Sequence, residues 1–253
     1  MPRPEKEEFN SSKVKIDFPG RVQWLPAPGD LFMAAVKDDP AWADQDLSAL
    51  FSPGELAARR GGAGARGWLL GRLAAKAAAG RLWRLSPAEV EIRSGPEGRP
   101  WSFRASAPAG FISLSHTRGA AAAVAASRPV GVDLEPWARP FSDRAWAWAF
   151  SLGERRLAEN GGSFPARLAL WCAKEAAAKS WGRALLEHLP RVRVAEADWP
   201  AGRLTVAWRG RGLEFSEVRL SRWDIYLVAL AQSGINEGRA ALGGRPACGP
   251  GPE

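Results

Sequence analysis

The chain has 253 residues and carries 35 lysines and arginines against 27 aspartates and glutamates, a formal net charge of +8. With 46% hydrophobic residues it can bury a core, and this composition excludes collagen-like, mucin-like and wholly disordered proteins. Only seven of the basic residues are lysines, and the strong bias toward Arg, Ala and Gly is typical of a GC-rich coding sequence. The positive charge is therefore a weak indication of nucleic-acid binding.

Two cysteines, Cys172 and Cys248, and two histidines, His116 and His188, are too few for a disulfide framework or a Cys/His zinc site. The N-terminal segment MPRPEKEEFNSSK is polar where a signal peptide needs an apolar region. The run of small apolar residues at 119–126 is far shorter than a membrane span. We therefore expect a cytoplasmic monomer that has no membrane partner.

An internal repeat organises the chain. The residues FSPGE at 51–55 recur as FSLGE at 150–154, and each contains an S-x-x-E capping box that opens a helix. A longer helix is expected next in each copy, and strands after it; these ranges are 64–80 and 111–126 in the first copy and 164–182 and 218–231 in the second. Aligning the long helices places Arg72 against Glu175 and Lys76 against Lys179.

These ordered pairings predict an α+β protein of two similar halves related by a pseudo-twofold axis. The N-terminal half spans 13–127 and the C-terminal half spans 128–236. The Gly/Pro-rich segment 237–253 is expected to be a flexible tail. Two such halves would meet along a cleft, which is the usual place for a ligand.

Two acids occur together in the predicted strand PVGVDLEP at 129–136. Period-2 alternation puts Gly131, Asp133 and Glu135 on one face of this strand and apolar side chains on the other. Two carboxylates in register repel each other unless a cation lies between them, and hard oxygen ligands suit Mg²⁺. The alternative is an ordinary solvated strand edge, because short motifs often match by chance.

The helix sequence WCAKEAAAK at 171–179 holds a second group of candidates. Glu175 could supply a third carboxylate, and Lys174 and Lys179 could neutralise phosphate oxygens. Between 38 and 253 the only other lysine is Lys76, and a compact ammonium serves a phosphoryl oxygen differently from a planar guanidinium. The alternative is a common surface Glu–Lys pair spaced at i, i+4.

A third candidate is SLSHT at 113–117, which follows Gly98-Arg99-Pro100. The hydroxyl of Ser115, the imidazole of His116 and the guanidinium of Arg99 could together hold a phosphate monoester. A Ser–His hydrolase is not favoured, because neighbours on a strand point to opposite faces and no G-x-S-x-G elbow occurs. The alternative is a half-buried histidine that caps a carbonyl.

Taken together, these motifs resemble the Sfp-type 4′-phosphopantetheinyl transferases. That family's pattern is a G-[VI]-D-x-E strand followed, about forty residues later, by [WF]-x-x-K-E-[AS]-x-x-K; here the matching segments are 131–136 and 171–179, with SLSH at 113–116. The resemblance implies the family's duplicated α+β fold and a Mg²⁺-dependent activity. The 4′-phosphopantetheine arm of coenzyme A would pass to a serine of an acyl or peptidyl carrier protein, releasing adenosine 3′,5′-bisphosphate.

The resemblance also implies roles for single residues. Asp133, Glu135 and Glu175 would hold Mg²⁺, and Glu175 would deprotonate the serine directly or through water. Catalytic charge stabilisation would come from Lys179 and Lys174. The residues expected to bind coenzyme A are Arg66, Arg99, Ser115, His116 and Lys179. An acidic carrier protein, with a role in secondary metabolite biosynthesis, is the expected partner.

Two other classes of function are weighed against this one. A non-catalytic coenzyme A or nucleotide-binding regulator of the same fold is disfavoured by the three intact carboxylates. A basic nucleic-acid-binding protein would need a clustered patch with stacking aromatics, whereas the 13 tryptophans are spread along the chain.

Overall fold

The computed structural model describes residues 22–40, 47–59, 61, 64–95, 98–210 and 212–233. The predicted tail at 237–253 lies outside these residues. The chain divides into two compact units, with the boundary between Ser127 and Arg128. In the described part of the chain, no helix combines the length and hydropathy needed to cross a membrane.

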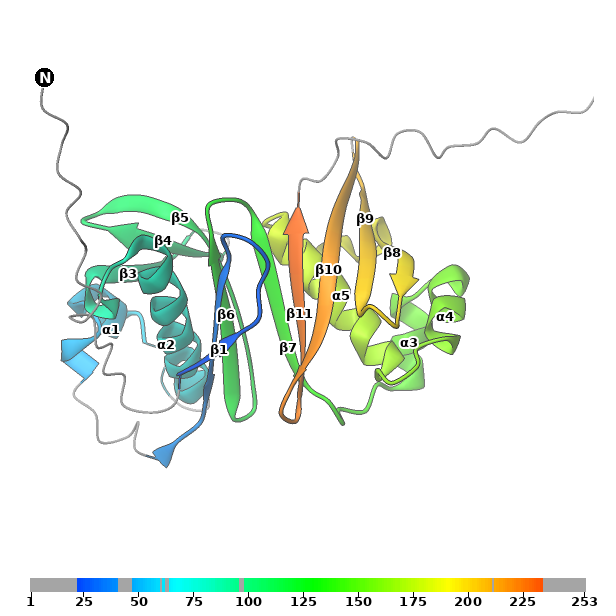
Figure 1. Ribbon diagram of the computed structural model, residues 1–253, viewed down its shortest axis with the longest axis horizontal. Helices are drawn as coiled ribbons and strands as arrows, with labels where there is room; N and C mark the ends of the chain where they lie inside the picture. Colours follow the sequence, from blue (N-terminus) through cyan, green and yellow to red (C-terminus); the bar gives the residue numbers. More distant parts are fainter. Residues whose placement is uncertain are drawn as a thin grey trace, which may run out of the picture. The chain divides into compact units, whose positions relative to one another are not determined.

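The first unit is a six-stranded antiparallel sheet with one long helix packed against it (Figure 1). Its strands have the order β1-β2-β6-β5-β4-β3 and the bounds β1 Val22–Leu25, β2 Phe32–Lys37, β3 Val90–Ser94, β4 Pro100–Arg104, β5 Ala107–Thr117 and β6 Ala120–Ala126. Its helices are α1 Pro53–Ala57 and α2 Gly64–Trp83, with 3-10 turns at Leu47–Ala49 and Pro87–Glu89. The long helix α2 packs on β6, β2 and β5.

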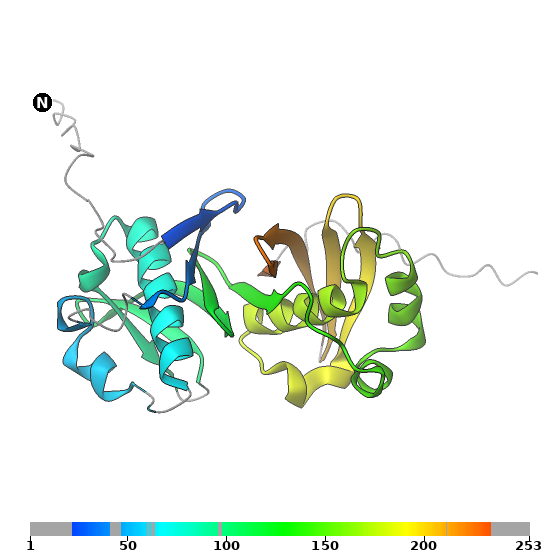
Figure 2. The same cartoon turned by 90° about the horizontal axis from the view of Figure 1, so that it is seen from below.

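The second unit is a five-stranded antiparallel sheet in the order β7-β11-β10-β9-β8. The strand bounds are β7 Val130–Pro136, β8 Val192–Asp198, β9 Arg203–Arg209, β10 Leu213–Trp223 and β11 Tyr226–Ser233. The helices are α3 Asp143–Ala149, α4 Leu152–Glu159, α5 Ala166–Ser180 and α6 Leu185–His188, with a 3-10 turn at Leu189–Arg191. The helix α5 packs on β7, β11 and β10 (Figure 2).

The two sheets share one topology. When the edge strand β1 is set aside, the order β2-β6-β5-β4-β3 corresponds strand for strand to β7-β11-β10-β9-β8. In both units a short capped helix is followed by a long helix that covers the sheet. This shared order confirms the predicted α+β class with two similar halves.

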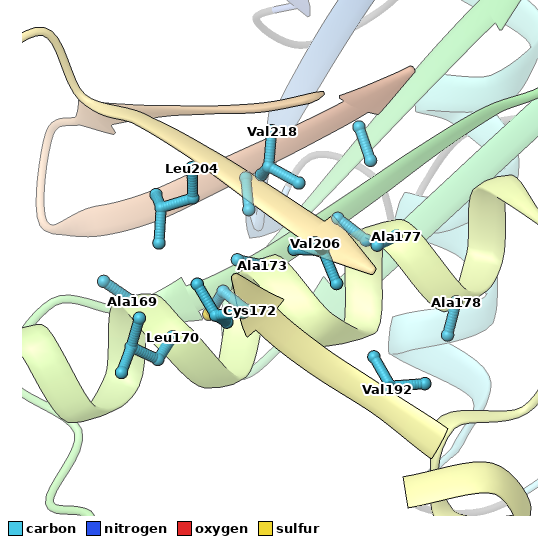
Figure 3. Packing of buried hydrophobic residues seen from close by; sticks show 14 of the residues in the cluster. Ala169, Leu170, Cys172, Ala173, Ala177, Ala178, Val192, Leu204, Val206 and Val218 are labelled. Carbon is cyan, nitrogen blue, oxygen red and sulfur yellow. The ribbon is translucent and has the colours of Figure 1, made fainter. Parts of the chain in front are cut away.

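Small side chains bring each long helix close to its sheet. In the second unit, Ala169, Ala173 and Ala177 of α5 are fully buried in a core that also contains Val206 and Val218 of the sheet (Figure 3). In the first unit the alanines of α2 pack in the same way on the alanine-rich strand β6, all of whose residues are buried. Close packing of this kind leaves little room for any larger residue.

Each unit also buries one lysine–glutamate ion pair. Lys76 Nζ lies 2.9 Å from Glu55 in the first unit, and Lys174 Nζ lies 2.7 Å from Glu154 in the second. Both glutamates belong to the predicted capping boxes, which the structure confirms at Ser52 and Ser151.

The surroundings of the two pairs match. The carboxylate of Glu55 accepts a hydrogen bond from the N–H of Ile92 on β3, and that of Glu154 accepts one from Val194 on β8. The ring of Phe51 faces the first ammonium, as the ring of Phe150 faces the second.

Lys76 is therefore the counterpart of Lys174, and the predicted pairings of Lys76 with Lys179 and of Arg72 with Glu175 are wrong. Both helices are rich in alanine, so their sequences can be aligned in more than one register. Burial of the ammonium decides the register, and the counterpart of Glu175 is then Ala77, a residue that cannot bind a metal.

Candidate functional site

Strand β7 and helix α5 come into close contact at Gly131. A Cβ at this position would overlap the carbonyl oxygen of Ala176 and lie 2.7 Å from the backbone nitrogen of Ser180. Glycine lets the helix backbone rest directly on the strand. Side chains further along the same face of β7, beginning with Asp133, are thereby brought against α5.

Asp133 is buried, with 5% of its surface exposed, and is held by Lys179 of α5. Its Oδ1 atom accepts a hydrogen bond from Lys179 Nζ at 2.8 Å, and the Lys179 ammonium also donates to the carbonyl of Val132. The pKa of the buried Cys172 thiol on the same helix is raised by burial and then by the charges of Asp133 and Glu135. Cys172 and Lys179 are seven residues apart, which is two helical turns and places them on one face.

Lys179 keeps its charge at neutral pH. Burial alone would lower the pKa of its ammonium, but Asp133 and Glu175 outweigh burial and raise the pKa above its usual value. About a quarter of the side chain is exposed, 27%. A protonated lysine is thus fixed between a buried carboxylate and the surface.

Glu135, two residues beyond Asp133, forms an ion pair with Arg139. Its side chain is mostly covered, whereas that of Arg139 is about half exposed. Burial and the charge of Asp133 raise the pKa of Glu135, although Arg139 and Lys179 oppose them. Burial is the main cause of the rise, and Asp133 adds to it.

Among these groups, Glu175 is the one whose pKa lies near neutral pH. Burial raises its pKa to about 7; Lys179 lowers it, while Asp133 and Glu135 raise it. The electrostatic coupling means that the three carboxylates lie near enough to sense one another. A carboxyl group with a pKa near 7 can take up or release a proton at physiological pH, which is the requirement for a general base.

These residues fit a divalent cation by their donor chemistry. Three carboxylates that sense one another's charge are hard oxygen ligands of the kind that Mg²⁺ binds. Over the described ranges, no group of three or more His, Cys, Asp or Glu side chains is already arranged around a metal position. Two of the three carboxylates are instead paired with protein cations, Asp133 with Lys179 and Glu135 with Arg139.

The structure does not bring Lys174 to this group. Its side chain is fully buried, donates to the carbonyl of Ala149 at 2.9 Å and pairs with Glu154. Burial lowers the pKa of Lys174 despite the attraction of Glu154. This geometry argues against the predicted contact of Lys174 with phosphate, because the ammonium is already enclosed by protein oxygens.

Two of the predicted coenzyme A ligands are arginines of the first unit. Arg66 begins α2 and is held by Asp38, with Nε 2.5 Å from Oδ1, and by the carbonyl of Asp39. Arg99 precedes β4, and its guanidinium lies 5.8 Å from the ring centroids of both Trp101 and Phe111. These contacts hold Arg66 beside an acid and Arg99 beside two aromatic rings.

Ser115 and His116 lie on opposite faces of β5. Ser115 is buried, whereas the exposed His116 packs its ring on α2, where a Cβ at Gly67 would come within 2.8 Å of His116 Nδ1. The structure therefore does not direct these two side chains to one point. The predicted cleft between the halves stays a prediction.

Sequence reasoning missed two residues of the carboxylate site. Cys172 lies three residues before Glu175 and seven before Lys179, a spacing that already places all three on one side of a helix. Arg139 lies four residues after Glu135, but Pro136 ends the strand between them, so no regular spacing predicts their contact.

Residues 129–231 match the family model for the 4′-phosphopantetheinyl transferase superfamily. The match covers about two fifths of the chain and contains the three carboxylates and the lysine of the site, Asp133, Glu135, Glu175 and Lys179. A comparison with curated proteins gives no match. The second unit is thus similar to a domain of phosphopantetheine-transferring enzymes.

Proposed function

We propose that this protein transfers the 4′-phosphopantetheine arm of coenzyme A to a serine of an acyl or peptidyl carrier protein. The observation that carries the proposal is the grouping of three coupled carboxylates and a charged lysine inside the segment similar to the transferase superfamily. The finer assignment to the Sfp type rests on the sequence motifs.

The transfer forms one bond and breaks one. The serine oxygen attacks the phosphorus that carries the pantetheine arm, and the bond from that phosphorus to the bridging oxygen of the pyrophosphate breaks. Adenosine 3′,5′-bisphosphate leaves with the electron pair. The serine proton passes to Glu175, directly or through a water, because the pKa of Glu175 near 7 lets it act as a base.

The other requirement is stabilisation of the negative charge on the phosphate oxygens. Lys179 keeps its proton next to Asp133, so its ammonium is available to a phosphoryl oxygen on which negative charge develops. Asp133, Glu135 and Glu175 are the residues that would hold Mg²⁺. The bound ion would neutralise the pyrophosphate of coenzyme A. Lys174 takes no part in this proposal.

The first unit would bind the nucleotide end of coenzyme A. Arg66 is about one third exposed and can exchange the carboxylate of Asp38 for a phosphate. Arg99, Ser115 and His116 are proposed to contribute to the same region. Binding by residues on α2, before β4 and on β5 would position the pyrophosphate, and positioning is most of the catalysis in phosphoryl transfer.

The test is transfer to purified apo carrier proteins with coenzyme A and Mg²⁺, followed by mass spectrometry. We expect a mass gain of one phosphopantetheine on at least one carrier. Asp133→Ala and Glu175→Gln should abolish the gain, while the exposed Glu159→Gln, which also removes one acid, should not. Tight coenzyme A binding without transfer to any of several acyl and peptidyl carriers would contradict the proposal and favour a regulator.

A further inference from the structure

Arg139 lies in a turn that is fixed to the sheet. Its N–H donates to the carbonyl of Pro136 at 2.9 Å, and the N–H of Trp137 donates to the carbonyl of Ile225 at 2.7 Å in the β10–β11 hairpin. The ring of Trp137 packs on Phe164 at a centroid distance of 5.8 Å. The backbone of the turn is thus held in place, and it keeps the guanidinium beside the end of β7.

The two partners of the Arg139–Glu135 ion pair have unequal access to water. Only 14% of the Glu135 side chain is exposed, against 47% of the Arg139 side chain. The carboxylate is committed to its position by the packing around β7, whereas the guanidinium can swing into solvent at small cost. A cation that binds Glu135 Oε1 must displace Arg139 from that atom.

We propose that Arg139 is a built-in competitor of the divalent cation, which it opposes by occupying Glu135 when no metal is bound. The inference rests on the proposed function, because it takes Glu135 as a metal ligand. Arg139 is thereby a positioning residue that sets metal affinity.

Charge balance explains why an arginine would pair with Glu135 when no metal is bound. Three acids near one another would leave a poorly compensated negative site if Lys179 were the only cation facing them. Arg139 supplies a second positive charge in the metal-free state and leaves as the metal brings its own. The site can then remain folded without metal, at the expense of weaker metal binding.

The experiment measures Mn²⁺ binding by calorimetry, without coenzyme A or carrier protein. Arg139→Gln should tighten binding by about two- to five-fold, the range expected when a half-exposed ion pair no longer competes. Arg139→Lys keeps the charge and should bind Mn²⁺ like the unaltered protein. Arg203→Gln is the matched control, because Arg203 pairs with Asp198 at 3.3 Å in the same unit and is similarly exposed.

A second comparison identifies the competitor's target. In a Glu135→Gln background, Arg139→Gln should no longer tighten Mn²⁺ binding, because the carboxylate for which the two cations compete is gone. Equal Mn²⁺ affinities of Arg139→Gln and Arg203→Gln would overturn the inference. Weaker Mn²⁺ binding by Arg139→Gln than by the unaltered protein would overturn it as well, and so would the absence of Mn²⁺ binding by both Arg139→Gln and the unaltered protein. If Arg139→Gln binds Mn²⁺ more tightly while carrier proteins stay unmodified, the proposed transfer fails and the metal competition stands.

Discussion

Replacing Lys174 with Met separates a structural role from a catalytic one. Lys174 is fully buried, and its ammonium contacts Glu154 at 2.7 Å and the carbonyl of Ala149 at 2.9 Å. Met has a similar length and no charge, so Lys174→Met leaves the buried Glu154 carboxylate with only the more distant Arg193, whose Nη1 lies 3.8 Å from Oε2. Glu154 also caps α4 and accepts a hydrogen bond from the N–H of Val194 on β8. Loss of its cation partner therefore weakens the contacts of both a helix and a strand.

The expected cost follows from this burial. Removing one partner of a buried ion pair costs about 3–5 kcal/mol, because the remaining charge loses its close cation. For a protein with a total stability of about 5–15 kcal/mol this is a large fraction. It corresponds to a fall in melting temperature of roughly 10–20 °C.

The assay is thermal unfolding followed by circular dichroism, with two comparisons. Lys76→Met removes the matching ammonium of the first unit and should be similarly destabilising, because Lys76 is equally buried against Glu55. The double variant Lys174→Met with Glu154→Gln removes both charges and should be more stable than Lys174→Met alone.

Transfer activity at low temperature completes the test. Where Lys174→Met is still folded, its transfer rate per folded molecule should match that of the unaltered protein. A variant that melts at the normal temperature but no longer transfers phosphopantetheine would refute the structural role and restore Lys174 as a phosphate ligand.

Two further predictions concern β7 and α5. Gly131→Ala should destabilise the protein by about 3 kcal/mol or more in urea unfolding, because the added Cβ overlaps helix backbone. Gly153→Ala is the control and should change stability little, because the space around Gly153 is open. Equal effects of the two substitutions would argue against the close contact at Gly131. Burial raises the folded-state pKa of Glu175 to about 7, above its unfolded value near 4.5. The protonated side chain therefore contributes stability at low pH. This contribution, up to roughly 3 kcal/mol, is lost as the pH rises through 7. Glu175→Gln should therefore unfold at higher urea than the unaltered protein at pH 8 and at nearly the same urea at pH 4.5, with Glu159→Gln as the control; no difference at pH 8 would contradict the raised pKa.

Local patterns in the sequence were good predictors of local structure. The capping boxes at Ser52 and Ser151 are confirmed, since a hydroxyl and a carboxylate three residues apart satisfy the same helix end wherever they occur. Alternation along β7 correctly places Asp133 on the face with Gly131, because strand geometry leaves no other choice.

Other features depend on packing that no short segment reveals. Lys76 and Lys174 are buried although lysine is normally exposed, and a glutamate from another helix together with backbone carbonyls makes their burial possible. The contact of Arg139 with Glu135 depends on a turn anchored by Ile225, more than eighty residues away.

Residues on different sides of helix α5 have different roles. Lys174 helps to hold the unit together, whereas Cys172, Glu175 and Lys179 face β7 and the acids on it. Mutations that tune the chemistry can therefore accumulate on one side while the fold is maintained by the other. The first unit illustrates the outcome, because it keeps the buried lysine on α2 and has alanine at the position of Glu175. A duplicated scaffold of this kind can lose or gain a reactive site in one copy without unfolding.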